Sequence, residues 1–407
     1  MNYCDLYNHL KEIYNYNAPI IQVDDLIEIR NFDFHSENFR ILTGEEKYYC
    51  PDHQQMFRDE EVTDAQSSSS RLITDVVDST VMENRQFRYS VFTPRGIAKT
   101  ENVIMMFHGL NEKYWHKYLT WAYRLCLLTG KAVVLFPIAF HMNRAPHDWS
   151  DSRKMYALSE KRKTLFPNII DSTLTNVAIS SRLHIRPQRF LWSGLQTYHD
   201  VIDFIYNIRN GSHPIIKNNA SFDIFAYSIG SFLSQILMMA NSNKLFEKSK
   251  LFIFCGGSTF NRYSPVTKFI LDSASNVELY SYTIEHLDSH LKHDKRLGHF
   301  LGDDHPEGIC FRSMLNYKTL KSFREESFNN MSNRIAAIGL EQDSVIPPYE
   351  MMNTLKGSSL NIPIRVDVMD FDYKYKHEDP FPLLPKLNDQ LMKSYTAVFD
   401  RVAEFLQ

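Results

Sequence analysis

The chain has 407 residues, of which 43% are hydrophobic and 13% aromatic, and its formal net charge at pH 7 is −3. This length and composition allow a sizeable buried core, arranged as one large domain with additions or as two domains. The near balance of charge gives no indication of a nucleic-acid partner, and no apolar segment reaches the length of a membrane-spanning helix.

The five cysteines are irregularly spaced, at positions 4, 50, 126, 255 and 310. This spacing is typical of neither a disulfide framework nor a metal site, and Cys126 and Cys255 lie in apolar segments that predict buried thiols. The first residues lack a basic segment followed by an apolar one, so no secretory signal peptide is predicted. We therefore expect a soluble cytoplasmic protein with no cofactor and no bound metal.

Residues 1–84 differ in composition from the rest of the chain. Leu6, Leu10 and Ile13 have the spacing of an apolar helix face. Residues 52–71 are polar, and residues 66–71 have the composition of a flexible linker. We expect residues 1–84 to form an N-terminal extension that packs on the main domain or binds a partner.

A regular alternation of strands and helices begins at Arg85. Alternation of apolar and polar residues predicts a strand at 87–94, and apolar segments predict strands at 102–107, 132–138, 222–225, 251–255, 334–340 and 364–370. Helical spacing predicts helices at 115–128, 198–208, 232–239 and 387–405, and a long polar excursion occupies 139–193. The alternation predicts an α/β fold with a mostly parallel central sheet and helices on both faces.

Residues 276–330 interrupt this alternation between two predicted strands. The segment is charged, aromatic and partly helical. Because ligands bind at the carboxyl edge of an α/β sheet, we expect the segment to be a cap, or lid, over that edge. The core would then consist of residues 85–275 and 331–407.

A candidate nucleophile follows the strand predicted at 222–225. Ser228 lies between Ala226 and Gly230, in the strand–turn–helix context of a Gly-x-Ser-x-Gly nucleophile elbow. The tight turn requires small residues two positions before and after the serine, and Ala226 meets that need in place of glycine. The alternative interpretation is a serine that caps the helix, so its partners decide between the two.

Two later residues are candidates for those partners. A serine hydroxyl needs a base to become a nucleophile, and the base needs an acid that orients it. Asp343 follows the strand predicted at 334–340, and His377 follows the last predicted strand. Each alone is also typical of an ordinary loop. Their order after Ser228 is that of an α/β-hydrolase triad.

These motifs resemble the α/β-hydrolase superfamily, through His108-Gly109 after an early strand, the elbow at 226–230, the loop at 342–348 and the segment at 375–381. The resemblance covers about residues 85–275 and 331–407. The whole chain is similar to an uncharacterised bacterial branch of that superfamily, which implies a fold and a chemistry but no substrate.

The resemblance implies roles for the three residues. Ser228 would attack a carbonyl carbon, His377 would take and return the proton, and Asp343 would hold the imidazole. Backbone N–H groups would bind the oxyanion; the expected donors are those of Ile229, Leu110 and Gly109. An acidic side chain in the same loop, Glu112, would disfavour the oxyanion if it pointed inward.

Further polar residues are candidates for binding. We expect Tyr227, His141 and Arg144 in the substrate pocket, where Arg144 could meet a carboxylate or phosphate. His286, His290 and His293 have the i, i+4, i+7 spacing of one helix face, which could bind zinc if a fourth ligand closed the site. A solvated surface is the favoured interpretation of these histidines. Two other serines, Ser193 and Ser258, lack the elbow context, and we expect both to lie in turns.

These features predict a serine hydrolase that cleaves an ester, thioester or related acyl bond through an acyl-enzyme intermediate. A catalytically silent α/β-hydrolase-like binding protein is the alternative, because a fold does not settle function. A peptidase or an acyltransferase could use the same triad. The cap and the aromatic content lead us to expect a small or medium acyl substrate.

Overall fold

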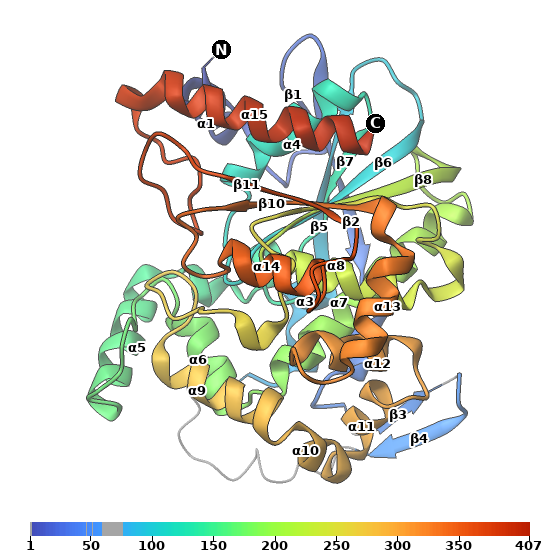
Figure 1. Cartoon of the computed structure of the whole chain (residues 1–407), viewed down its shortest axis with the longest axis vertical. Helices are drawn as coiled ribbons and strands as arrows, with labels where there is room; N and C mark the ends of the chain where they lie inside the picture. Colours follow the sequence, from blue (N-terminus) through green and yellow to red (C-terminus); the bar gives the residue numbers. More distant parts are fainter. Residues whose placement is uncertain (1, 46, 51, 59–75) are drawn as a thin grey trace.

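The computed structural model describes residues 2–45, 47–50, 52–58 and 76–407. The linker predicted at 66–71 lies outside these residues. Within them, a nine-stranded sheet forms the centre of the molecule, in the order β1-β2-β5-β7-β6-β8-β9-β10-β11 (Figure 1). Its strands are β1 (Ile20–Gln22), β2 (Ile27–His35), β5 (Gln86–Pro94), β6 (Thr100–Phe107), β7 (Ala132–Leu135), β8 (Ile216–Tyr227), β9 (Leu251–Phe254), β10 (Ile335–Leu340) and β11 (Arg365–Met369).

Most of this sheet is parallel. Strands β7, β6, β8, β9, β10 and β11 run in one direction, in that order across the sheet. Strand β5 is antiparallel to both of its neighbours, β2 and β7, and the edge strand β1 is antiparallel to β2. A mostly parallel sheet with a reversed strand near one end and helices on both faces is the α/β-hydrolase arrangement, so the predicted fold class is confirmed.

Both faces of the sheet are buried. Helices α1 (Tyr3–Ile13), α4 (His116–Thr129) and α15 (Asn388–Leu406) pack on one face, and α7 (Arg189–Arg209), α8 (Ile229–Ala240) and α14 (Pro348–Leu355) pack on the other (Figure 1). Neighbouring strand residues alternate between the two cores: Met105 faces α7 and α8, whereas Ile104 faces α4. The central strands therefore read as continuous apolar segments, as a sheet covered on both faces requires.

The sheet begins earlier in the chain than the sequence predicts. Strand β2 pairs with β5 along its whole length, from Ile27 opposite Pro94 to His35 opposite Gln86. Helix α1, at the expected position, packs against α4 and α15. Residues 20–35 are thus part of the core sheet, and the predicted boundary at residue 84 does not separate them from it. The apolar residues of β2 alternate with polar and acidic ones, a pattern that also indicates a strand, although none was predicted there.

The segments between strands supply a further group of helices. Between β7 and β8 lie α5 (Ser152–Leu165) and α6 (Val177–Ile185); between β9 and β10 lie α9 (Ser273–Tyr280), α10 (Leu287–His293), α11 (Lys295–Leu301), α12 (Pro306–Leu315) and α13 (Lys321–Asn330). Helix α6 packs against α9, and α12 packs against α8 (Figure 1). The two insertions therefore form one layer beyond α7 and α8, and the excursion at 139–193 is largely helical.

Some local predictions need correction. Helix α7 begins at Arg189, before the predicted start at residue 198, because Leu191, Trp192 and Leu195 extend its buried face. Ser193 therefore lies in a helix, not in a turn. The described residues also form a two-stranded hairpin, β3 (Lys47–Cys50) and β4 (Gln55–Arg58), a short helix, α3 (Met82–Arg85), and several short 3-10 and π segments. No helix within the described ranges combines the length and the apolar character needed to cross a bilayer.

Candidate active site

Ser228 lies in the sharp turn between β8 and α8. Its backbone has φ of 55° and ψ of −123°, a sparsely populated region that costs on the order of 1–3 kcal/mol for a residue with a side chain. Gly230 permits the turn, because a Cβ there would lie 2.7 Å from the carbonyl oxygen of Phe107 in β6. Ala226 is fully buried. Small residues on both sides let the start of α8 approach the sheet closely.

Three buried side chains from separate loops meet at this turn. Ser228 Oγ lies 2.7 Å from His377 Nε2, and His377 Nδ1 lies 2.7 Å from Asp343 Oδ2. Each residue is only 3–4% exposed. His377 follows β11 and Asp343 follows β10, so the carboxyl ends of neighbouring parallel strands bring the partners to the serine. The structure thus joins the three predicted residues in one hydrogen-bonded chain.

The carboxylate of Asp343 is fixed from both sides. Its Oδ1 accepts hydrogen bonds from the backbone N–H groups of Val345 and Ile346, each at 2.9 Å, which leaves Oδ2 for the imidazole. With the carboxylate accepting at Nδ1, the proton of a neutral His377 resides on Nδ1. Nε2 is then the acceptor for the hydroxyl of Ser228, as a general base requires.

Tyr227 packs against His377 and holds its backbone. Its hydroxyl donates a hydrogen bond to the carbonyl of His377, and the two rings are stacked with centroids 5.4 Å apart. Tyr227 is 1% exposed and does not line the pocket described below. It therefore holds the His377 loop, and its predicted place among the pocket residues is not supported.

Two backbone N–H groups are free to face a ligand near Ser228. Ile229 is the first residue of α8, so its N–H has no acceptor within the helix. The N–H of Leu110 makes no hydrogen bond to any part of the chain that the structure describes. Gly109 differs from the prediction, because its N–H donates to the Tyr118 hydroxyl at 2.9 Å. The N–H of Gly109 is therefore not free to bind an oxyanion.

The loop that carries Leu110 is held by His108 and Glu112. Backbone N–H of Ile138 donates to His108 Nε2 at 2.9 Å, and His108 Nδ1 lies 2.8 Å from the Gly109 carbonyl, which places the proton on Nδ1. Burial holds the pKa of His108 well below its usual value, so the ring is neutral. Glu112 accepts a hydrogen bond from Tyr118 at 2.9 Å and forms an ion pair with Lys117. Its charge is therefore compensated by Lys117, and Glu112 is not among the residues that line the pocket described below.

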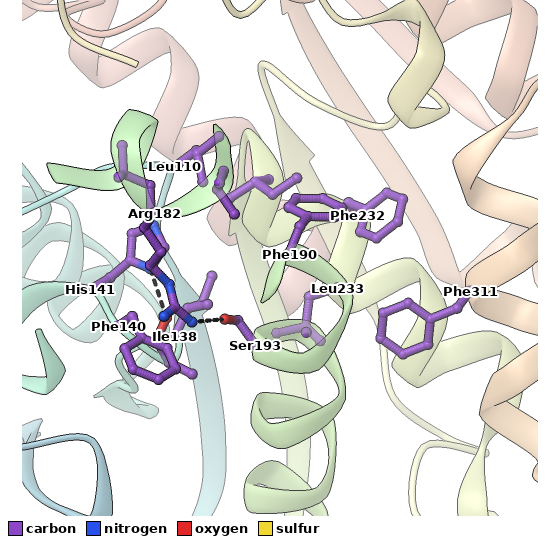
Figure 2. A pocket seen from close by; sticks show the side chains of 15 residues that line it. Leu110, Ile138, Phe140, His141, Arg182, Phe190, Ser193, Phe232, Leu233 and Phe311 are labelled. Atoms are coloured by element: carbon purple, nitrogen blue, oxygen red, sulfur yellow. Dashed lines mark hydrogen bonds between the residues drawn. The ribbon is translucent and has the colours of Figure 1, made fainter. Parts of the chain in front are cut away.

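An apolar pocket lies next to this site. Figure 2 shows its walls: Phe190, Phe232, Leu233 and Phe311 lie on one side, and Ile138, Phe140, His141 and Arg182 lie on another. The pocket reaches Leu110 and Ile229, so it opens beside Ser228 even though Ser228 itself is not among its lining residues. The helical part of the lining comes from α6, α7, α8 and α12, and so from both insertions, while Leu110 and residues 138–141 lie in the loops after β6 and β7.

His141 contributes an unpaired acceptor to this pocket. Its Nδ1 lies 2.9 Å from the Ala139 carbonyl, to which it donates, whereas its buried Nε2 has no hydrogen-bond partner. Burial lowers the pKa of His141 to about 4, so the ring is neutral near pH 7. Two other polar side chains of the lining, Arg182 and Ser193, are hydrogen-bonded to each other at 3.2 Å, whereas His141 Nε2 is left without a partner among the described residues. An unpaired acceptor favours a ligand that brings one hydrogen-bond donor.

The arginines near the pocket are not free to bind an anion. Arg182 forms a bidentate ion pair with buried Asp78, and its guanidinium stacks 3.7 Å from the Phe140 ring centroid. Burial lowers the pKa of Arg182 to about 10, so it stays charged at neutral pH. Arg144 lies outside the pocket, fully buried and 2.7 Å from Asp200. The expected contact between Arg144 and a substrate anion is therefore wrong.

Sequence reasoning missed most of the pocket. Arg182 could have been noticed in the sequence, because a charged residue interrupts the otherwise apolar face of α6 at this position. The aromatic residues Phe190, Phe232 and Phe311 carried none, since their spacing is that of core residues.

The predicted histidine trio does not form a metal centre. His286 and His293 are exposed, and His290 stacks on Tyr282. Two other histidines of the same insertion, His299 and His305, meet Cys50 and His53 instead; within the described ranges these four make up the group suited to holding a metal ion.

A family of unknown function, DUF6051, matches the chain over residues 1–407. No curated protein matches the sequence significantly. The chain is similar in structure to carboxyl esterase 2 from Tuber melanosporum, at 11% identity and a TM-score of 0.42, over 79% of this chain and 82% of that one. It is also similar to a carboxylesterase from Lactobacillus plantarum WCFS1, at 9% identity and a TM-score of 0.40, over 78% and 90%. Likenesses of this size carry no argument about the site.

Proposed function

This chain belongs to the DUF6051 family, and we propose that it is a serine hydrolase that cleaves a carboxylic ester, a thioester or a related acyl bond. One observation carries the proposal: the hydrogen-bonded chain from Ser228 through His377 to Asp343, built on an elbow with positive φ and set beside an apolar pocket. An ordinary helix cap needs neither the strained backbone nor a histidine aligned on its hydroxyl.

The geometry supports acyl transfer in two steps. Ser228 Oγ attacks the carbonyl carbon while its proton passes to His377 Nε2, and Asp343 stabilises the imidazolium that forms. The oxyanion accepts hydrogen bonds from the N–H groups of Ile229 and Leu110. Collapse of the tetrahedral intermediate breaks the bond to the leaving group, which takes the proton from His377. Water then repeats the sequence on the acyl-enzyme, releases the acid and restores Ser228.

The pocket defines the proposed acyl group. Aromatic and aliphatic walls favour a small or medium apolar chain. A charged acyl group would lose its hydration there without gaining a counter-ion, because Arg182 is already paired with Asp78. His141 Nε2 would accept a hydrogen bond from a hydroxyl or amide on that chain. We therefore propose a neutral acyl substrate with a single donor group.

Labelling with a fluorophosphonate probe tests this function. Wild-type protein should be labelled, Ser228→Ala should lose all labelling, and His377→Ala should lose most of it. Ser258→Ala is the matched control, because Ser258 is also buried just beyond a strand of the sheet but has no histidine on its hydroxyl. This control should label like the wild type.

Folded wild-type protein that reacts with neither the fluorophosphonate nor a smaller sulfonyl fluoride would overturn the proposal in favour of a silent binding protein. The smaller reagent distinguishes a serine that is unreactive from a reactive serine that the larger probe cannot reach.

A further inference from the structure

The hairpin of β3 and β4 rests against the inserted helices α11 and α12 (Figure 1). Four side chains with metal-binding atoms converge there. Cys50 ends β3, His53 lies in the hairpin turn, His299 belongs to α11, and His305 immediately precedes α12. The two pairs are almost 250 residues apart in sequence, so only the fold brings them together.

Their atoms have the separations of metal ligands. Cys50 Sγ lies 3.6 Å from His53 Nδ1 and 3.7 Å from His305 Nε2, and His305 Nε2 lies 3.0 Å from His299 Nε2. All four ligand atoms lie within 4.8 Å of one another. Tetrahedral zinc with Zn–S of about 2.3 Å and Zn–N of about 2.0–2.1 Å places its ligands about 3.6 Å (S to N) and about 3.4 Å (N to N) apart.

A carboxylate lies near the Nδ1 atom of each of the two buried histidines. His299 Nδ1 lies 3.5 Å from Asp304 Oδ2, and His305 Nδ1 lies 3.5 Å from Glu307 Oε1. These separations are longer than a normal hydrogen bond, and Glu307 Oε1 has no hydrogen-bond partner within the described ranges. A carboxylate beside each Nδ1, which favours the ring proton on that nitrogen, is the usual outer arrangement around metal-binding histidines. The two Nε2 atoms therefore face each other as acceptors, and a cation between them satisfies both.

Burial is also suited to a metal. Cys50, His299 and His305 are 1%, 6% and 4% exposed, whereas His53 is exposed and closes the group from the solvent side. One thiolate and three neutral imidazoles leave a net charge of +1 around a divalent ion. Glu307, which is 2% exposed and lies 3.2 Å from His199, offsets that charge. The ligand spacings Cys-x2-His and His-x5-His are those of paired zinc ligands.

We propose that Cys50, His53, His299 and His305 bind one Zn²⁺ ion in a tetrahedral structural site. Four protein ligands leave no open position for water or substrate, so the ion holds structure and takes no part in chemistry. It joins the N-terminal hairpin to the helices inserted between β9 and β10. This inference does not rest on the proposed hydrolase function, and it replaces the expectation that the chain holds no metal.

Metal analysis of untagged, full-length protein grown with zinc gives the first test. Wild type should retain about one zinc per chain after gel filtration, and Cys50→Ser and His299→Ala should each retain less than about a fifth of that. His286→Ala and His293→Ala are the matched controls, because both residues are exposed histidines of the same insertion outside the group. They should keep full stoichiometry.

Cobalt substitution tests metal coordination directly, because a cluster of side chains that binds no metal gives no cobalt absorption bands. Co²⁺ added to chelator-treated wild type should produce the intense visible bands of a tetrahedral site and the near-ultraviolet charge-transfer band of a thiolate ligand. Cys50→Ser should lose the charge-transfer band, whereas His286→Ala should keep it.

A folded wild type that neither retains zinc nor develops these bands would overturn the proposal, as would full zinc content in Cys50→Ser. Circular dichroism establishes folding in each case. Wild type that unfolds when chelated and refolds with Zn²⁺ counts in favour, because the binding free energy is then part of the folding free energy.

Discussion

At the scale of single residues, the site depends on a carboxylate that sets a tautomer. Asp343 accepts from His377 Nδ1 at 2.7 Å while two backbone N–H groups hold its other oxygen. An amide in its place can donate to Nδ1, which moves the ring proton to Nε2 and removes the base that Ser228 needs. The identity of one oxygen atom therefore decides the reactivity of a serine that lies two hydrogen bonds away.

Asp343→Asn should lower kcat for an activated ester by about 10⁴-fold with little change in stability. The control is Asp372→Asn, an exposed carboxylate in the next loop that forms a 3.9 Å ion pair with exposed Lys393. Steady-state hydrolysis of p-nitrophenyl esters measures both. A loss of less than about tenfold in Asp343→Asn would contradict the assigned role.

The buried histidines predict how stability depends on pH. Burial lowers the pKa of His141 to about 4, below the value of about 6.5 in the unfolded chain. Below about pH 6.5 the unfolded state binds a proton that the folded state excludes, so stability is full above this pH and falls toward pH 4. This one group should cost about 2 kcal/mol between pH 7 and pH 5. His213, with a pKa lowered to about 4 by burial, acts in the same direction.

Urea unfolding of His141→Gln at pH 7 and pH 5 should therefore show a smaller loss of stability than the wild type. His293→Gln, at an exposed position, should match the wild type. Equal losses in His141→Gln and the wild type would mean that His141 is protonated in the folded protein.

At the scale of elements, the close approach of α8 to β6 positions the nucleophile. A Cβ on Gly230 would lie 2.7 Å from the Phe107 carbonyl oxygen, and this backbone atom cannot turn aside. Gly230→Ala should therefore displace the start of α8, reduce stability by about 1–3 kcal/mol and lower activity, since Ser228 and the Ile229 N–H move with the helix.

Gly194→Ala in α7 is the comparison, because its nearest contact is the edge of the Phe311 ring, at 3.0 Å, on a side chain that can shift. Stability there should be unchanged or gain up to about 1 kcal/mol from helix propensity. Thermal and urea unfolding measure both variants. Equal stability of the two alanine variants would show that the turn does not depend on the small residue.

At the scale of the whole molecule, the N-terminal residues complete the sheet. Ile29 is fully buried in the core beneath α1 and α4, whereas nearby Leu26 is 59% exposed. Ile29→Ala should destabilise the entire protein by about 2–5 kcal/mol, and Leu26→Ala should change stability by less than about 0.5 kcal/mol. A wild-type main transition in Ile29→Ala, with only a separate small transition lost, would mean that residues 1–84 fold apart from the core.

The sequence by itself determined the elements of the main sheet and the three residues that meet at the elbow. Residues 103–107 and 251–255 are apolar throughout because both faces of the sheet are covered, and the loops holding Asp343 and His377 follow strand ends that must share an edge. These signals are local: each can be read within a dozen residues. The strand at Ile27–His35 was not predicted, although its apolar residues alternate with polar ones as in the strand predicted at 87–94.

Only the tertiary structure decided which polar groups are free and which are engaged. The N–H of Gly109 donates a hydrogen bond to Tyr118, and Arg144 forms an ion pair with Asp200. Both residues nevertheless follow strand ends, as the residues of the site do. Cys50 reaches His305 across more than 250 residues. Periodicity reports which face of an element is buried but not which side chain lies opposite it, because partners are chosen by packing between elements that are distant in the chain.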